Sequence, residues 1–121
     1  MPAKKILIVD DSSTDRQSLL EKLAKQGFAC VTAVDGADAI AKSKSELPDL
    51  ILMDVIMPGM NGYEATRAIT RDEATRHIPV IMCTSKNQET DRIWGMRQGA
   101  KDYMLKPINA RELVSKIKAL E

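Results

Sequence analysis

The segment that decides the fold is Leu50–Gly62, with the sequence LILMDVIMPGMNG. Its apolar run ends in one carboxylate, Asp54, and the turn Pro58-Gly59 follows soon after. A short apolar run bounded by turn signals is typical of a strand that is buried on both faces of a parallel sheet. Asp54 then stands at the carboxyl end of this strand, where open parallel sheets bind their ligands. Because a buried carboxylate is costly unless it is paired or holds a metal ion, the segment predicts other charged groups beside Asp54.

The bulk composition is that of an ordinary globular domain. The chain has 121 residues, of which 44% are hydrophobic and 29% charged, and its formal net charge is +1. This length supports one core, so we expect residues 1–121 to form a single domain. A charge so near zero disfavours nucleic acid or an anionic membrane as a partner. No apolar run approaches the roughly 20 residues that cross a bilayer, and the first residues lack a signal-peptide core, so we expect a cytoplasmic protein without membrane insertion.

Short apolar runs alternate with helical patterns along the whole chain. The predicted strands cover residues 4–9, 28–34, 50–53, 79–83 and 103–105. Helical patterns begin near Thr14, Asp35, Asn61, Glu89 and Asn109. Such alternation indicates a parallel sheet that right-handed crossovers cover on both faces. We therefore predict an α/β fold: a doubly wound, five-stranded parallel sheet of the flavodoxin-like (βα)5 type, with strand order 2-1-3-4-5.

Residue spacing also predicts which helical side chains face the core. In the first and last helices these are Leu19, Leu20, Leu23, Ala24, Leu113, Val114, Ile117 and Leu120. In the helix at residues 89–98 we expect Ile93 and Met96 to be buried, with Trp94 on its flank and partly exposed.

Side chains that bear chemistry follow the predicted strands at their carboxyl ends. They are Asp10, Asp11, Asp54, Thr84 and Lys106. In a parallel sheet these ends line one edge, so three acids, a hydroxyl and an amine are expected to meet in one cleft. The predicted strand order sets Asp10 and Asp11 directly beside Asp54.

This combination of groups favours phosphoryl chemistry. Three clustered carboxylates repel one another, which predicts a cation among them, and Mg²⁺ suits oxygen ligands and binds phosphate as well. Asp54 stands alone at the centre of the edge and is the best-placed nucleophile, and carboxylates form aspartyl phosphates. Phosphoryl transfer needs alignment and charge neutralisation, which Mg²⁺ and Lys106 would supply, with a hydrogen bond from the Thr84 hydroxyl.

Each of these residues also has a plainer explanation. Asp10 and Asp11 could cap the first helix, although Ser12 or Ser13 is already suited to that position. Alone, Thr84 is a turn residue, Tyr103 is core and Lys106 is a solvated surface lysine. The expected convergence at one edge is what favours the functional interpretation.

At this point the whole chain resembles the receiver domain of two-component response regulators, in particular the single-domain, CheY-like type. The resemblance rests on Asp10-Asp11, Asp54, Met57-Pro58-Gly59, Asn61-Gly62, Thr84-Ser85 and Lys106-Pro107. Each of these motifs is weak alone, but their order and their places at predicted strand ends make the set specific.

The resemblance implies a role for each matching position. Asp54 would be the phosphoacceptor, and Asp11 with Asp54 would bind Mg²⁺ directly. Asp10 would hold metal-bound water, and the backbone carbonyl of Ile56 would complete the protein ligands. Lys106 would contact the phosphate.

A switch is implied as well. Phosphate would draw the Thr84 hydroxyl inward, and the Tyr103 ring would follow into the vacated space. The bond between Lys106 and Pro107 is a good candidate for the cis form.

The function implied is a phosphorylation-activated switch of a two-component system, not an enzyme beyond its own phosphorylation and dephosphorylation. Its partners would be a sensor histidine kinase or phosphotransfer protein and a downstream protein target. Because we expect no output domain, signalling would proceed by protein contact, with Trp94 and Arg97 on the output surface. We expect a monomer, and a weak dimer stays open.

Two roles stay open within this class: a diffusible regulator in chemotaxis or twitching motility, and a phosphorelay intermediate or phosphate sink. The overall pattern resembles the small regulators of type IV pilus twitching motility, the PilH and PilG group. Two flanking positions depart from the polar types that the family often has. The apolar Ile56 cannot orient an attacking water, which favours slow loss of the phosphate, whereas the effect of Lys86 has no clear sign.

Two other classes of function compete with this one. A phosphatase with an aspartyl nucleophile needs a second Asp two residues after the first, where this chain has Ile56. A nucleotide- or flavin-binding domain needs a glycine-rich turn, but GxxxxGK[ST] and GxGxxG are absent from the sequence, and residues 11–15 contain no glycine.

Overall fold

Five strands form one parallel sheet in the order β2-β1-β3-β4-β5, which confirms the predicted fold. The computed structural model describes residues 4–85 and 89–120, except the side chains of 89–91. The strands are β1 (Lys5–Val9), β2 (Ala29–Ala33), β3 (Leu50–Asp54), β4 (Val80–Thr84) and β5 (Asp102–Leu105). Because β3 is central, its side chains are covered on both faces.

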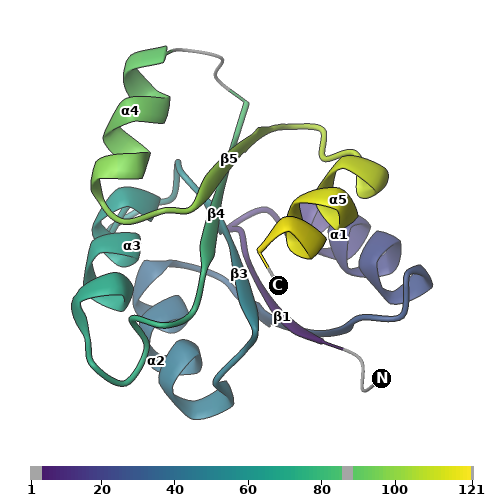
Figure 1. Ribbon diagram of the computed structural model, residues 1–121, viewed down its shortest axis with the longest axis horizontal. Helices are drawn as coiled ribbons and strands as arrows, with labels where there is room; N and C mark the ends of the chain where they lie inside the picture. Colours follow the sequence, from purple (N-terminus) through teal and green to yellow (C-terminus); the bar gives the residue numbers. More distant parts are fainter. Residues whose placement is uncertain (1–3, 86–88, 121) are drawn as a thin grey trace.

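Helices cover both faces of the sheet. They are α1 (Ser13–Lys25), α2 (Gly36–Glu46), α3 (Gly62–Arg71), α4 (Glu89–Arg97) and α5 (Ala110–Ala119). Figure 1 shows α2, α3 and α4 on one face and α1 and α5 on the other. Alternate residues of β3 enter two separate cores: Ile51 and Met53 pack under α2 and α3, and Leu50 and Leu52 pack toward α1 and α5. This double burial explains why β3 is a continuous apolar run.

Polar residues start the helices α1, α2, α3 and α5. Ser12, Asp35, Asn61 and Asn109 each accept a hydrogen bond from the backbone N–H three residues further on. Such N-caps satisfy backbone donors that have no partner within the helix. Ser12, not Ser13, caps the first helix, so the serine cap leaves the side chains of Asp10 and Asp11 available for the cleft.

The prediction that α4 buries Ile93 and Met96 is wrong. These side chains are 44% and 38% exposed, and Trp94 is 51% exposed. Gly95 is the buried residue of this turn. It packs so closely against the sheet that an added Cβ would lie 3.3 Å from the Met82 side chain. The absent side chain of Gly95 lets α4 approach the sheet closely, which turns its larger apolar residues toward solvent.

Two further residues predicted to face the core are also exposed. Ala24 lies in the last turn of α1, and Leu120 is the C-cap of α5. Both residues lie at the C-terminal end of a helix, beyond the turns whose apolar side chains pack against the sheet. Leu19, Leu23, Leu113 and Ile117 are buried as predicted, and Leu20 and Val114 are partly buried.

A close backbone approach holds the loop after β3 against the end of that strand. The N–H of Gly62 donates a hydrogen bond to the carbonyl of Val55 over 2.9 Å. A Cβ on Gly62 would lie 2.1 Å from the carbonyl oxygen of Asp54, so no larger residue fits without movement. The start of α3 is therefore locked against the backbone of Asp54.

The substitution Gly62→Ala tests this contact. We expect it to lower the free energy of unfolding by about 1–3 kcal/mol or more, because the added methyl group meets backbone that cannot move away freely. Chemical denaturation measures the change. Gly95→Ala is the matched control: its methyl group meets the flexible Met82 side chain, and alanine is the better helix former, so the loss should be smaller. Equal losses in the two variants would contradict the proposed role of Gly62.

Candidate functional site

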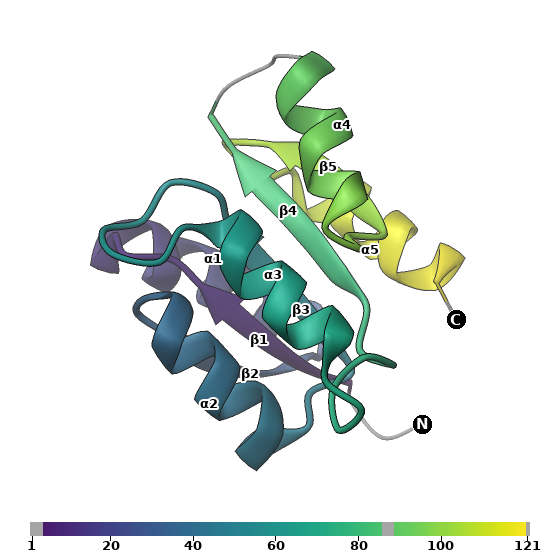
Figure 2. The same cartoon turned by 90° about the vertical axis from the view of Figure 1, so that its left-hand side faces the viewer.

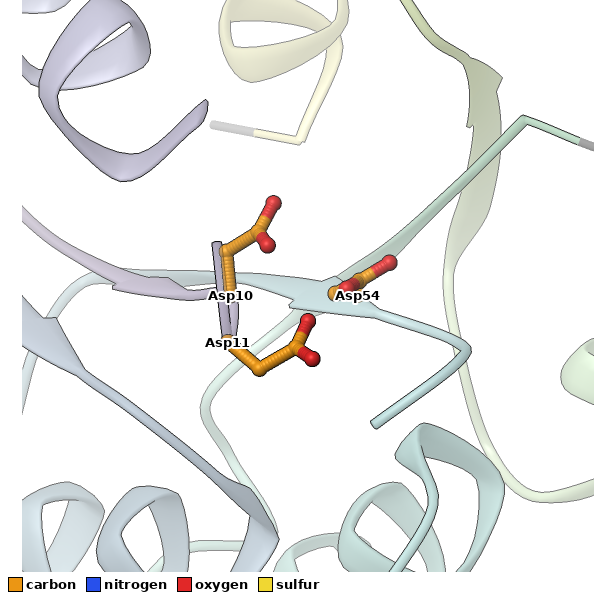
Figure 3. A group of neighbouring side chains, drawn as sticks. All are labelled: Asp10, Asp11 and Asp54. Atoms are coloured by element: carbon orange, nitrogen blue, oxygen red, sulfur yellow. The ribbon is translucent and has the colours of Figure 1, made fainter. Parts of the chain in front are cut away.

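Three carboxylates meet at the carboxyl ends of β1 and β3. The side chains of Asp10, Asp11 and Asp54 each offer an oxygen atom, and these atoms all lie within 4.8 Å of one another. Figure 3 shows the three carboxylate groups close together at the ends of the two strands. The strands are neighbours, with Val9 opposite Met53, so the next residues fall side by side. The sheet order thus brings together the acids that the sequence predicted would converge.

Asp10 is the most firmly held of the three. Its side chain is nearly buried, and one carboxylate oxygen accepts a hydrogen bond from the Ser12 N–H over 2.9 Å. Its carbonyl accepts a bond from the Arg16 guanidinium, and its N–H donates to the Ala33 carbonyl. Asp11, in contrast, is exposed at the mouth of the cleft.

Lys106 supplies the positive charge of the cleft. Its Nζ lies 2.7 Å from Asp10 Oδ2, 3.3 Å from Asp54 Oδ1 and 3.5 Å from Asp15 Oδ2. The backbone N–H of Lys106 donates to the Thr84 carbonyl over 2.7 Å, which ties the lysine to the end of β4. The Lys106-Pro107 peptide bond is cis, as the sequence predicted.

The electrostatics of the cleft favour an added cation. Burial of Asp54 raises the pKa of its carboxyl group to about 6, and the charge of Asp10 adds to this effect, whereas Lys106 opposes it. Burial acts to lower the pKa of Lys106, but the hydrogen bond to Asp10 and the charge of Asp54 raise it above the ordinary value. One ammonium group does not balance three carboxylates. Oxygen donors with excess negative charge are the ligands that suit Mg²⁺, so the residues present fit this ion.

Thr84 ends β4, and Tyr103 lies on the neighbouring strand β5, opposite Met82. Thr84 is buried at the end of β4 and follows Cys83, which stands opposite Asp54. Tyr103 is partly buried and packs against the core beneath α2 and α3. Thr84 thus lies on the strand next to that of Asp54, and the switch role of the pair stays a prediction.

The other residues predicted to be functional are not part of the carboxylate cluster. Ile56 has a side chain that is 53% exposed, and the role of its carbonyl stays a prediction. Trp94 and Arg97 are exposed on α4, apart from the carboxylate cluster. Lys86 falls outside the described residues.

Sequence reasoning missed two residues that support the cleft, Asp15 and Arg16. Both lie in the first turns of α1. The Asp15 carboxylate forms an ion pair with Lys106, and the Arg16 guanidinium donates a hydrogen bond to the carbonyl of Asp10. Their positions soon after Asp10-Asp11 were a usable signal, because the first turn of a helix that follows a strand lies over the end of that strand.

The pKa of Asp54 gives a prediction for the metal-free protein. Because this pKa lies above the ordinary 3.8, the folded state binds the proton more readily than the unfolded chain between about pH 4 and 6. The free energy of unfolding therefore falls as pH rises through that window. Asp54→Asn removes this effect, so we expect the variant to be more stable near neutral pH by about 1–3 kcal/mol, and the difference to shrink toward pH 4.

Urea denaturation at several pH values, without divalent metal, measures this difference. Glu73→Gln is the control because Glu73 is an exposed carboxyl group outside the cluster. If Asp54→Asn destabilised the metal-free protein at neutral pH, the electrostatic account of the cleft would be wrong.

Comparison with known proteins gives a consistent result. The family model of the response regulator receiver domain matches residues 6–118. Protein PilH of Pseudomonas aeruginosa is 48% identical over 116 residues, which cover 96% of each chain. The phosphate regulon transcriptional regulatory protein PhoB of the same organism is 42% identical over 120 residues, but the chain spans only 52% of its length.

Solved structures extend the comparison to the fold. Chemotaxis protein CheY4 of Vibrio cholerae has a TM-score of 0.91 and 31% identity, with 98% of this chain and 99% of that chain covered. The receiver domain of the sensor histidine kinase PA1611 from Pseudomonas aeruginosa has a TM-score of 0.90 and 30% identity, with 98% and 97% covered. That structure has a magnesium ion coordinated in the active site cleft.

The helices in the described part of the chain lack the length and apolar character that a membrane span requires. The match to the family model covers nearly the whole chain, and the structure has the strand order and the acidic cleft that the sequence predicted. The chain belongs to the family of response regulator receiver domains of two-component signalling.

Proposed function

We propose that this protein is a phosphorylation-activated switch that accepts a phosphoryl group on Asp54. The observation that carries the proposal is the position of Asp54: a nearly buried carboxylate with two further acids and the Lys106 ammonium within reach. With a pKa of about 6, the group is largely ionised at neutral pH and is therefore a nucleophile.

The donor would be a histidine kinase or a phosphotransfer protein. A carboxylate oxygen of Asp54 forms a bond to phosphorus while the bond from phosphorus to the donor imidazole nitrogen breaks, and that nitrogen keeps the electron pair. Lys106 Nζ lies 3.3 Å from Asp54 Oδ1, so it is within reach of an oxygen on a phosphoryl group attached there. Its ammonium group would stabilise the charge that the transfer places on those oxygens.

Mg²⁺ is the cofactor that the cleft favours. Asp11 and Asp54 would bind the ion directly, Asp10 would hold a metal-bound water, and the backbone carbonyl of Ile56 would complete the protein ligands. Bound there, the ion supplies positive charge against the phosphoryl oxygens. The magnesium ion in the related PA1611 receiver structure supports this assignment.

Signalling would proceed by protein contact after phosphorylation. The Thr84 hydroxyl would turn toward the phosphate, and the Tyr103 ring would follow. Trp94 and Arg97, both exposed on α4, would form part of the surface that the downstream partner recognises. Ile93 and Met96 on α4 and Leu105 on β5 are exposed apolar side chains and would add to this surface.

The similarity to PilH supports a regulator of the twitching-motility type over other receiver roles. A phosphorelay intermediate or phosphate sink is the second candidate. The apolar side chain at Ile56 favours it in one respect, because slow loss of the phosphate would let the group pass to another receiver. An aspartyl phosphatase is disfavoured, because Ile56 occupies the position of the general acid.

Phosphorylation can be measured directly by mass spectrometry. Incubated with Mg²⁺ and a small acyl phosphate donor, the protein should gain the mass of one phosphoryl group. Asp54→Asn should abolish the gain, and removal of Mg²⁺ with a chelator should reduce it severely. Asp49→Asn is the matched control, because Asp49 is an exposed carboxyl group just before the opposite end of β3. Labelling that survives in Asp54→Asn would refute the assignment.

The output surface is tested by binding. Trp94→Ala should weaken the affinity for a phosphorylation-dependent partner about tenfold or more, because an exposed tryptophan at an interface commonly carries much of the binding energy. Val34→Ala is the control, since Val34 is an exposed apolar residue next to the edge strand β2. Titration calorimetry with the phosphorylated protein gives both affinities. Unchanged affinity in Trp94→Ala would remove Trp94 from the surface.

A further inference from the structure

A second cavity lies on the side of the sheet that α3 and α4 cover, at the C-terminal ends of these two helices. Its volume is about 290 Å³. Its lining consists of Thr70, Arg71, Arg76, Ile78, Arg97, Gln98, Gly99 and Lys101. Figure 2 shows α3 and α4 on the same face of the sheet. No residue of the carboxylate cleft takes part in this cavity, which we call the basic pocket.

Four cationic side chains line the basic pocket: Arg71, Arg76, Arg97 and Lys101. All four are exposed, and within the described part of the chain none of them makes an ion pair or a side-chain hydrogen bond. The lining includes no acid. Asp72, which follows α3, pairs instead with Lys44 over 3.0 Å and accepts a hydrogen bond from the Ala74 N–H.

A plainer explanation accounts for only part of this charge. Arg71 and Arg97 stand in the last turns of α3 and α4, where a cation offsets the negative end of the helix dipole. Each helix end carries about half a negative charge, so two ends offset about one of the four positive charges. The formal charge of the whole chain is +1, so a surplus of about three at one pocket is a local concentration.

The walls of the basic pocket are fixed to each other. Thr70 Oγ1 lies 2.8 Å from the carbonyl oxygen of Gln98 and 2.9 Å from that of Thr66. Gly99 has a φ of +103°, and a Cβ there would lie 2.7 Å from Thr70 Oγ1. This tight contact joins the end of α4 to the end of α3. The backbone that carries the cations is therefore organised before any ligand arrives, which lowers the cost of binding.

The chemistry of the lining restricts the class of ligand. The planar guanidinium group of arginine donates two parallel hydrogen bonds to the oxygens of one phosphate group. Several cationic side chains around one small cavity therefore suit a ligand with several linked phosphate groups. The volume is at the lower limit for small-molecule sites, which run from about 300 Å³ upward, so the ligand is compact. None of the lining side chains is aromatic, so a nucleobase has no stacking partner there. We propose that the basic pocket binds a compact oligophosphate through its phosphate groups alone.

Inorganic tripolyphosphate is the probe for this proposal. Titrated into the isotope-labelled protein without Mg²⁺, it should shift the backbone amide signals of Thr70, Gly99 and Lys101 until they saturate. Arg76→Gln and Arg97→Gln should each weaken the affinity about tenfold, because each removes charge-assisted hydrogen bonds. Arg111→Gln is the matched control: Arg111 is exposed on α5 and lies outside the pocket, so its loss should change the affinity less than twofold.

Five further outcomes bear on the proposal. ATP should bind about as tightly as tripolyphosphate, and Asp54→Asn should leave the titration unchanged, so the result is separate from that of phosphorylation. Signals that shift only around Lys106 would place the anion in the carboxylate cleft and overturn the proposal. An equal loss of affinity in Arg111→Gln, or binding to phosphatidylglycerol vesicles without binding of tripolyphosphate, would overturn it too.

Discussion

The structure depends on the burial of two carboxylates beside one ammonium group. Asp10 and Asp54 are 4% and 6% exposed, and Lys106 Nζ lies 2.7 Å from one and 3.3 Å from the other. A buried charge without a partner costs several kcal/mol, so Lys106 is what makes this arrangement tolerable. The compensation is incomplete, because the pKa of Asp54 stays raised to about 6. The excess negative charge of this cleft disfavours the empty site and favours an added cation.

The rest of the fold serves to bring these groups to one place. Neighbouring parallel strands deliver the acids, and the tie from Lys106 N–H to the Thr84 carbonyl links β5 to β4 at the same edge. Gly62 lets the start of α3 press against the backbone of Asp54. The basic pocket has the opposite sign of charge, because its cationic side chains form no ion pair with an acid in the described part of the chain. One small α/β domain thus carries two charged sites of opposite sign.

Much of this arrangement was predictable, because it depends on local patterns. Apolar runs that end in polar residues located the strands, and the parallel topology then placed Asp10, Asp11, Asp54 and Lys106 together. The faces of α4 were not predictable in the same way. Residue spacing favoured burial of Ile93 and Met96, but the small Gly95 is the residue that packs against the sheet. Which face of α4 is buried therefore depends on the side chains that Gly95 meets, Met82 and Tyr63. The basic pocket was missed because its cations are separated in sequence and meet only through contact between α3 and α4.

A crystal structure of the protein with Mg²⁺ and beryllium fluoride, a mimic of a phosphoryl group, would show directly whether Asp54 accepts a phosphoryl group. We expect beryllium to be bonded to a carboxylate oxygen of Asp54, with Lys106 Nζ in contact with a fluoride. We also expect Mg²⁺ to be bound by Asp11 and Asp54. Beryllium fluoride on another carboxylate, or an Asp54 that stays unmodified while the ligands occupy a different site, would contradict the role proposed for Asp54.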